Sequence, residues 1–170
     1  MGESQPQVAV VMGSDSDLDV MRRCLEQLGE FGIAHEARIL SAHRTPEEVH
    51  AFAEAAGERG VKVVIAAAGM SAALAGTVAA RTTLPVIGVA MASGPLAGVD
   101  ALLATVQMPP GVPVACAGMG QAGAVNAAVL AAEILALADN NLAGRLRRFK
   151  ADQADRTLAK DRKLQQGPAQ

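Results

Sequence analysis

The sequence predicts an α/β fold with three layers, in which a parallel β-sheet carries helices on both faces. Short runs of apolar, β-branched residues alternate with segments whose apolar residues recur at helical spacing. The first run, VAVVM at residues 8–12, is apolar throughout and ends at Gly13, as a strand buried on both faces does. The chain has 170 residues, of which 51% are hydrophobic, so it suits a single domain over residues 1–170 with a sizeable core.

The elements follow one another in a regular order. Acidic residues at 15–19 open the first helix, because the helix dipole favours negative charge in the first turn. In the second helix, Thr45 is the expected N-cap, Pro46 the first helical residue and Glu48 the glutamate of a capping box. The expected strands are residues 8–12, 34–40, 61–68, 84–91 and 114–117, and the expected helices are residues 15–29, 45–59, 71–80, 99–106, 122–138 and, highly charged, 141–164.

Charge is distributed unevenly along the chain. Of the 32 charged residues, 17 lie in residues 1–62 and 13 in residues 133–170, which leaves only Arg81 and Asp100 in the 70 residues between. Membrane burial does not explain this segment, because it is dominated by Ala, Gly and Pro, which contribute little to insertion. We expect instead that the segment is covered by other copies of the same chain, which predicts a homo-oligomer and no membrane association.

Composition also excludes several partners. A net charge of −2, with three Phe and neither Trp nor Tyr, provides neither the positive surface nor the stacking platforms of a nucleic-acid reader. Cys24 and Cys116 lack the spacing of metal ligands. Reduced thiols and the lack of an export signal at the N-terminus predict a cytoplasmic protein without a metal site.

Candidate functional residues follow the first predicted strand, since ligands of open parallel sheets bind beyond the carboxyl ends of strands. Gly13 allows a tight turn, the hydroxyl of Ser14 can help to hold an anion, and Asp17 can accept a hydrogen bond from a sugar hydroxyl. An ordinary helix cap uses the same residue types, and composition does not separate the two interpretations.

The segment SAHRTP, which follows the second predicted strand, favours function more strongly. Arg44 offers a two-pronged donor for phosphate or carboxylate, and Ser41 lies at the start of the same turn. His43 is the type of side chain that most often moves protons at neutral pH. A histidine in a loop is usually only solvated, but its position at a strand end beside an arginine favours a functional role.

The segment GMGQAG, residues 118–123, matches the glycine spacing of a dinucleotide site. No further strand follows to supply the ribose-binding acid that such a site requires about 20 residues on. We therefore expect no dinucleotide cofactor, and we expect these glycines to permit close packing of a helix on a strand or the approach of a different ligand.

Four segments together resemble the PurE family of purine biosynthesis: VMGSDSD, SAHRTPE, GVDALLATVQMPPGVPV and the glycine-rich segment that leads into NAAVLAAEIL. The family comprises N5-carboxyaminoimidazole ribonucleotide mutases and aminoimidazole ribonucleotide (AIR) carboxylases, and the resemblance covers about residues 7–138. It implies a flavodoxin-like fold, a homo-octamer with active sites at subunit junctions, and a reaction without metal or cofactor that places a carboxylate on C4 of an imidazole.

The resemblance also implies roles for individual residues. Ser14 and Asp17 match the serine and aspartate that contact the nucleotide, Ser41 and Arg44 match residues of the phosphate loop, and His43 matches the catalytic histidine. The implied mechanism releases CO2 from N5-carboxyaminoimidazole ribonucleotide (N5-CAIR) in a closed pocket, where C4 recaptures it while His43 moves a proton.

One segment departs from the family pattern. The usual mutase sequence GAGGAAHLPG is here AAAGMSAALAG, so Ala73 replaces a second histidine and Met70-Ser71 replaces Gly-Ala. The carboxylase branch also lacks that histidine and carries a serine near this point, which makes Ser71 a further candidate for substrate binding. Gln121 stands where the mutase branch often has a lysine.

Other features favour the mutase branch. Arg44 and the length of the segment 118–128 are of the mutase type. We therefore expect a mutase that converts N5-CAIR to 4-carboxy-5-aminoimidazole ribonucleotide (CAIR). The alternatives are an AIR carboxylase that makes CAIR from AIR and CO2, and a non-catalytic regulatory protein that binds nucleotides on the same scaffold.

Overall fold

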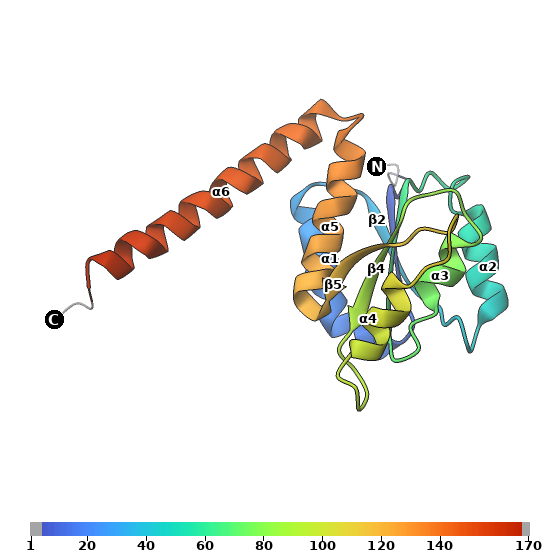
Figure 1. Ribbon diagram of the computed structural model, residues 1–170. Coiled ribbons are helices and arrows are strands. Elements are labelled where there is room, and N and C mark those ends of the chain that lie inside the picture. Colours follow the sequence, from blue (N-terminus) through green and yellow to red (C-terminus); the bar gives the residue numbers. More distant parts are fainter. Residues whose placement is uncertain (1–4, 168–170) are drawn as a thin grey trace.

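A computed structural model of the protein, which describes residues 5–167, contains one five-stranded sheet with the order β2-β1-β3-β4-β5 (Figure 1). All four neighbouring pairs are parallel. This is the strand order of flavodoxin-like folds, so the predicted fold class is confirmed. The strands are β1 (Val8–Met12), β2 (His35–Ile39), β3 (Val63–Gly69), β4 (Val86–Met91) and β5 (Ala115–Met119); the helices are α1 (Leu18–Glu30), α2 (Pro46–Ala55), α3 (Leu74–Ala79), α4 (Val99–Val106), α5 (Gly120–Ala136) and α6 (Asn140–Gln165).

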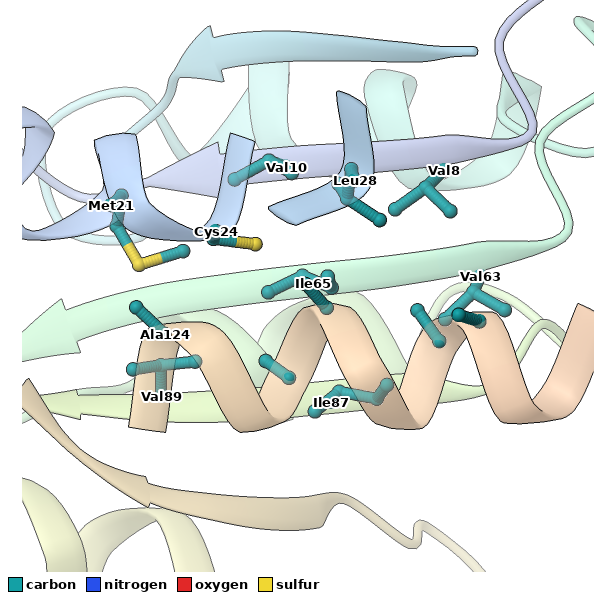
Figure 2. Close-up of a cluster of buried hydrophobic side chains, with 14 of the residues drawn as sticks. Val8, Val10, Met21, Cys24, Leu28, Val63, Ile65, Ile87, Val89 and Ala124 are labelled. Atoms are coloured by element: carbon teal, nitrogen blue, oxygen red, sulfur yellow. The ribbon is translucent and has the colours of Figure 1, made fainter. Parts of the chain in front are cut away.

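Helices cover both faces of the sheet. On one face, side chains of β1, β3 and β4 pack against α1 and α5, and Figure 2 shows Val10 and Ile65 among them. On the other face, the alternate residues of the same strands pack against α2 and α3, while α4 lies over β4. Five alanines of α5 are fully buried, namely Ala124, Ala127, Ala128, Ala131 and Ala132, so this helix lies close to the strands. Burial also raises the pKa of the Cys24 thiol to about 12, which keeps it an unreactive part of the core.

The second helix begins as predicted, with Thr45 as its N-cap residue and Pro46 as its first residue, but its capping and its end differ from the prediction. The capping box is wrong, because the Thr45 hydroxyl closes the preceding turn instead: it accepts from the Ser41 amide at 2.9 Å and donates to the Ser41 carbonyl at 3.2 Å. The helix ends at Ala55 rather than near residue 59, and turns follow as far as Gly60, whose φ is +94°.

The third helix begins three residues later than expected, at Leu74. Met70 has a φ of +52° and Ala72 a φ of +21°, and neither value is compatible with a right-handed helix. Residues 70–73 therefore form an irregular loop between β3 and α3.

The glycines of GMGQAG bring α5 close to β5, as expected. A Cβ on Gly123 would lie 2.6 Å from the carbonyl carbon of Gly118, which is too close for any side chain. The packing interpretation of this motif is thereby supported.

Helix α6 leaves the body of the domain. Its first turns are anchored by the buried side chains of Leu142 and Leu146 and by an edge-to-face contact between Phe149 and Phe31, with ring centroids 5.2 Å apart. The rest of the helix extends away from the sheet (Figure 1), and residues 151–167 are exposed. Among residues 5–167, no helix combines the length and apolar character needed to span a membrane.

Candidate active site

A pocket of about 460 Å³ lies at the carboxyl ends of the strands. It spans the loops that follow β2, β1, β3 and β4, which are neighbours in the sheet. The chain reverses its direction of winding between β1 and β3, and open α/β sheets bind their ligands at such a point. The polar lining residues are Ser14, Ser16, Asp17, Ser41, His43, Arg44 and Ser93, and the others are Gly13, Ala42, Ala68, Gly69, Met70, Ala72, Ala73 and Leu74.

The turn after β1 is held together by its own hydroxyl and carboxylate groups. The Ser14 hydroxyl accepts from the Ser16 amide at 3.3 Å and from the Ser16 hydroxyl at 2.9 Å, and it donates to Asp15 Oδ1 at 3.0 Å. These bonds cap a 3-10 turn over residues 15–17. The cap interpretation of Ser14 is therefore correct, and the same turn places Ser14 at the wall of the pocket.

Asp17 is the one charged residue that this turn buries, with 7% of its surface exposed. Burial raises the pKa of its carboxyl, as does the nearby Asp15, while a hydrogen bond from the Ser14 backbone and the positive charge of Arg44 act in the opposite direction. A Cβ added to Gly13 would lie 4.0 Å from Asp17 Oδ2. That Cβ would also lie 3.7 Å from the Ala67 carbonyl oxygen, so the space that Gly13 leaves beside this carboxylate has room for one small group.

Arg44 connects the loops after β2 and β1. Its Nη2 donates to the Gly13 carbonyl at 2.7 Å, its Nε donates to the Ser41 hydroxyl at 3.3 Å, and its backbone amide donates to the same hydroxyl at 3.2 Å. A guanidinium has five N–H donors, and two of them are used in these bonds. The group is fixed at the edge of the pocket with further donors to offer to an anion.

His43 lies on the same loop as Ser41 and Arg44, is exposed and lines the pocket. The pocket therefore combines a cationic anchor, a buried carboxylate and an imidazole. This set can bind a phosphorylated sugar and move a proton on a group attached to it.

The structure brings six of the seven predicted site residues together. The exception is Ser71, which is exposed and does not line the pocket, because the left-handed residues on either side of it turn the loop there. Met70 lines the pocket in its place. Prediction from sequence also missed Ser16, although it lies within the VMGSDSD motif, and Ser93, which follows the end of β4 as the other site residues follow their strands.

A hollow of about 280 Å³ between α1 and α5 is lined by exposed helix residues such as Arg23, Glu26 and Gln121. Within residues 5–167, no cluster of three or more His, Cys, Asp or Glu is placed to hold a metal ion.

Comparison with known proteins decides the family. The sequence pattern of the AIR carboxylase family matches residues 7–156. The chain belongs to the AIR carboxylase (PurE) family. The match includes every residue that lines the pocket, so the residues described above are those of the family domain.

Individual members of the family agree with this assignment. The chain is 52% identical over 142 residues to the N5-carboxyaminoimidazole ribonucleotide mutase of Bacillus subtilis, with 84% of this chain and 88% of the relative covered. It is 47% identical over 155 residues to the chloroplastic phosphoribosylaminoimidazole carboxylase of Vigna aconitifolia, with 91% of this chain but 28% of the relative covered. The crystal structure of Treponema denticola PurE superimposes with a TM-score of 0.85 at 32% identity, covering 94% of this chain and 98% of that one.

The raised pKa of Asp17 predicts a gain in stability when its charge is removed. The folded state binds the Asp17 proton more tightly than the unfolded state does, so the charged carboxylate opposes folding near neutral pH. Asp17→Asn should raise the midpoint of thermal unfolding at roughly pH 7 and lose this advantage as the pH falls and the wild-type carboxyl takes up its proton. Circular dichroism melts at several pH values measure the difference.

The control for this experiment is Asp19→Asn. Asp19 has a side chain that is 92% exposed, and it pairs with Arg22 at 3.7 Å, so its removal should bring no such gain. A variant Asp17→Asn that is less stable than wild type at neutral pH would contradict the effect assigned to burial.

Proposed function

We propose that the protein is an N5-carboxyaminoimidazole ribonucleotide mutase, which converts N5-CAIR to CAIR in purine biosynthesis in the cytoplasm. The observation that carries the proposal is the pocket in which Arg44, Asp17 and His43 meet, in a chain 52% identical to a protein of that name.

The binding residues divide between the two ends of a ribonucleotide. Arg44, fixed to the Gly13 carbonyl and to Ser41, offers its remaining donors to the phosphate, and a charge-assisted contact of this kind is about twice as strong as a neutral one. The buried carboxylate of Asp17 accepts from a ribose hydroxyl. The Ser14 hydroxyl already donates one hydrogen bond and accepts two within its turn. This is its full capacity, so it contacts the nucleotide by exchanging one of these bonds.

The reaction needs one proton to be moved. The N–C bond of the carbamate breaks, its electron pair stays on nitrogen, and nitrogen takes up a proton as CO2 leaves. C4 of the imidazole then forms a bond to the carbon of CO2 and releases its own proton. The atoms balance without an oxidant or a reductant, and His43 at the pocket wall is the group proposed to carry the proton between the two sites.

The carboxyl donor separates the mutase from the carboxylase alternative. Ala73 lines the pocket where the mutase branch carries a histidine, and this substitution favours the alternative. We expect the purified protein to form CAIR from N5-CAIR alone, and to form far less from AIR with bicarbonate. Product formed only in the second assay would make the protein an AIR carboxylase, and nucleotide binding without turnover of either would make it a regulatory protein.

The role of His43 is tested by removing its ability to titrate. His43→Asn should lower kcat about 10²–10⁴-fold, the range of general acid–base effects, while the dissociation constant of the nucleotide changes little. His50→Asn is the control, because His50 lies on α2 outside the pocket lining and its loss should leave kcat unchanged. An unchanged kcat in His43→Asn would remove this residue from the proton transfer.

The proposal extends to a homo-oligomer, and specifically to an octamer. Val99, Leu103 and Val106 lie on one side of α4 and are 55%, 49% and 49% exposed, and the neighbouring Leu96 is 59% exposed. They belong to the charge-poor segment of the sequence, and a contiguous apolar patch of this kind is typical of an interface. Other copies of the chain are the proposed cover.

An assembly held by this patch should resist salt. At about 1 M NaCl charges are screened beyond roughly 3 Å, but apolar contacts persist, so the mass measured by light scattering should not fall. Leu103→Asp should give a smaller species at any salt concentration. A wild-type monomer, or dissociation by salt alone, would contradict the proposed contact.

A further inference from the structure

Met70 occupies a backbone conformation that side chains other than glycine disfavour. Its φ is +52°, in the left-handed region, which glycine adopts freely and which crowds the Cβ of other residues. The side chain is also 56% exposed, so burial in the core does not explain a methionine here. A strained residue at the edge of a functional pocket points to a use for its side chain.

The Met70 side chain is directed across the loop after β4. A Cβ added to Gly94 would lie 3.1 Å from Met70 Cγ and 3.5 Å from its Sδ, so the thioether occupies the space that Gly94 leaves. The preceding residue makes a similar contact, since a Cβ on Gly69 would collide with the Ser93 hydroxyl. The two loops are therefore packed together, and Met70 is held at a defined place on the pocket wall.

This wall is the apolar side of the pocket. The strand order places the loop after β2, with His43 and Arg44, at one end of the pocket and the loop after β4 at the other, with the loops after β1 and β3 between them. From the end of β3 to the start of α3 the lining residues beside Met70 are Ala68, Gly69, Ala72, Ala73 and Leu74, none of which can form a side-chain hydrogen bond. The hydroxyl of Ser93, in the loop after β4, is the one polar side chain that the lining has at this end. Met70 is the largest and most flexible of these groups.

We propose that the Met70 side chain forms the wall that retains CO2 between its release from nitrogen and its capture by C4, which rests on the mutase function proposed above. CO2 is uncharged and hydrogen-bonds weakly, so a polar wall would bind water in preference to it. A polarisable thioether contacts it without offering a donor, and it excludes the water through which CO2 would escape. Only two bonds to the CO2 carbon change: the N–C bond breaks when CO2 is released, and the C4–C bond forms when it is captured.

The test follows the carboxyl carbon through one turnover. N5-CAIR labelled with ¹⁴C in its carbamate carboxyl is converted in unlabelled bicarbonate buffer, and the label retained in CAIR and the AIR released are measured. Met70→Gly removes the side chain and also relieves the left-handed strain, so it should fold at least as well as wild type. It should lose label about tenfold more often per turnover, the effect expected for one lost apolar contact with a small molecule.

Three further variants separate the side chain from the shape of the loop. Met70→Leu keeps an apolar group and should restore retention, whereas Met70→Asn, which tolerates a positive φ, should lose label as the glycine variant does. Ala97→Gly relieves a similar φ of +49° in an exposed residue outside the pocket lining and should not change retention. Equal retention in Met70→Gly and wild type, or equal loss in Met70→Gly and Met70→Leu, would overturn the inference.

Failure of the inference differs from failure of the proposed function. If the wild-type protein does not convert labelled N5-CAIR, both are wrong. If it does, and Met70→Gly and Met70→Asn keep the label, the mutase function stands and only the role of Met70 is rejected.

Discussion

Parallel pairing of every neighbouring strand is the constraint on which the site depends. It brings four loops to one edge of the sheet, and the reversal of winding between β1 and β3 opens the space between them. The contact of Arg44 with the Gly13 carbonyl, at 2.7 Å, then fixes the loop after β2 against the loop after β1. Without this arrangement, Arg44, Asp17 and His43 would belong to separate surface turns.

Two groups at the pocket are held in states that do not favour folding. Asp17 is a buried carboxylate whose pKa burial raises, and Met70 is a methionine with a left-handed backbone. An asparagine at position 17 would avoid the buried charge, and a glycine at position 70 would adopt the positive φ without strain. Stability sacrificed at a site is typical of residues kept for function. The functions proposed for these two residues are binding of a ribose hydroxyl by Asp17 and retention of CO2 by Met70.

Small residues determine how closely α5 packs on the sheet, and they lie in the charge-poor segment of the chain. The buried alanines of α5 and the Gly118–Gly123 contact allow helix and strand to approach closely. Close packing of small residues thus fills the core of a chain that has only three aromatic residues. The same charge-poor segment leaves apolar side chains of α4 exposed. Removal of these apolar side chains from water is the physical reason for the proposed oligomer.

The sequence by itself determined the features that local patterns encode. The unbroken apolar run predicted β1 at residues 8–12, and the helix expected at residues 99–106 is α4 with the same bounds. Position at a strand end singled out Ser41, His43 and Arg44, which line the pocket. Only the tertiary structure decided which neighbour each group contacts. The bond between Arg44 and Gly13 joins residues 31 positions apart, and the Thr45 hydroxyl closes a turn instead of capping a helix. Met70 rather than Ser71 lines the pocket because Met70 and Ala72, between β3 and α3, have positive φ values. No pattern of residues in the sequence predicts this backbone conformation.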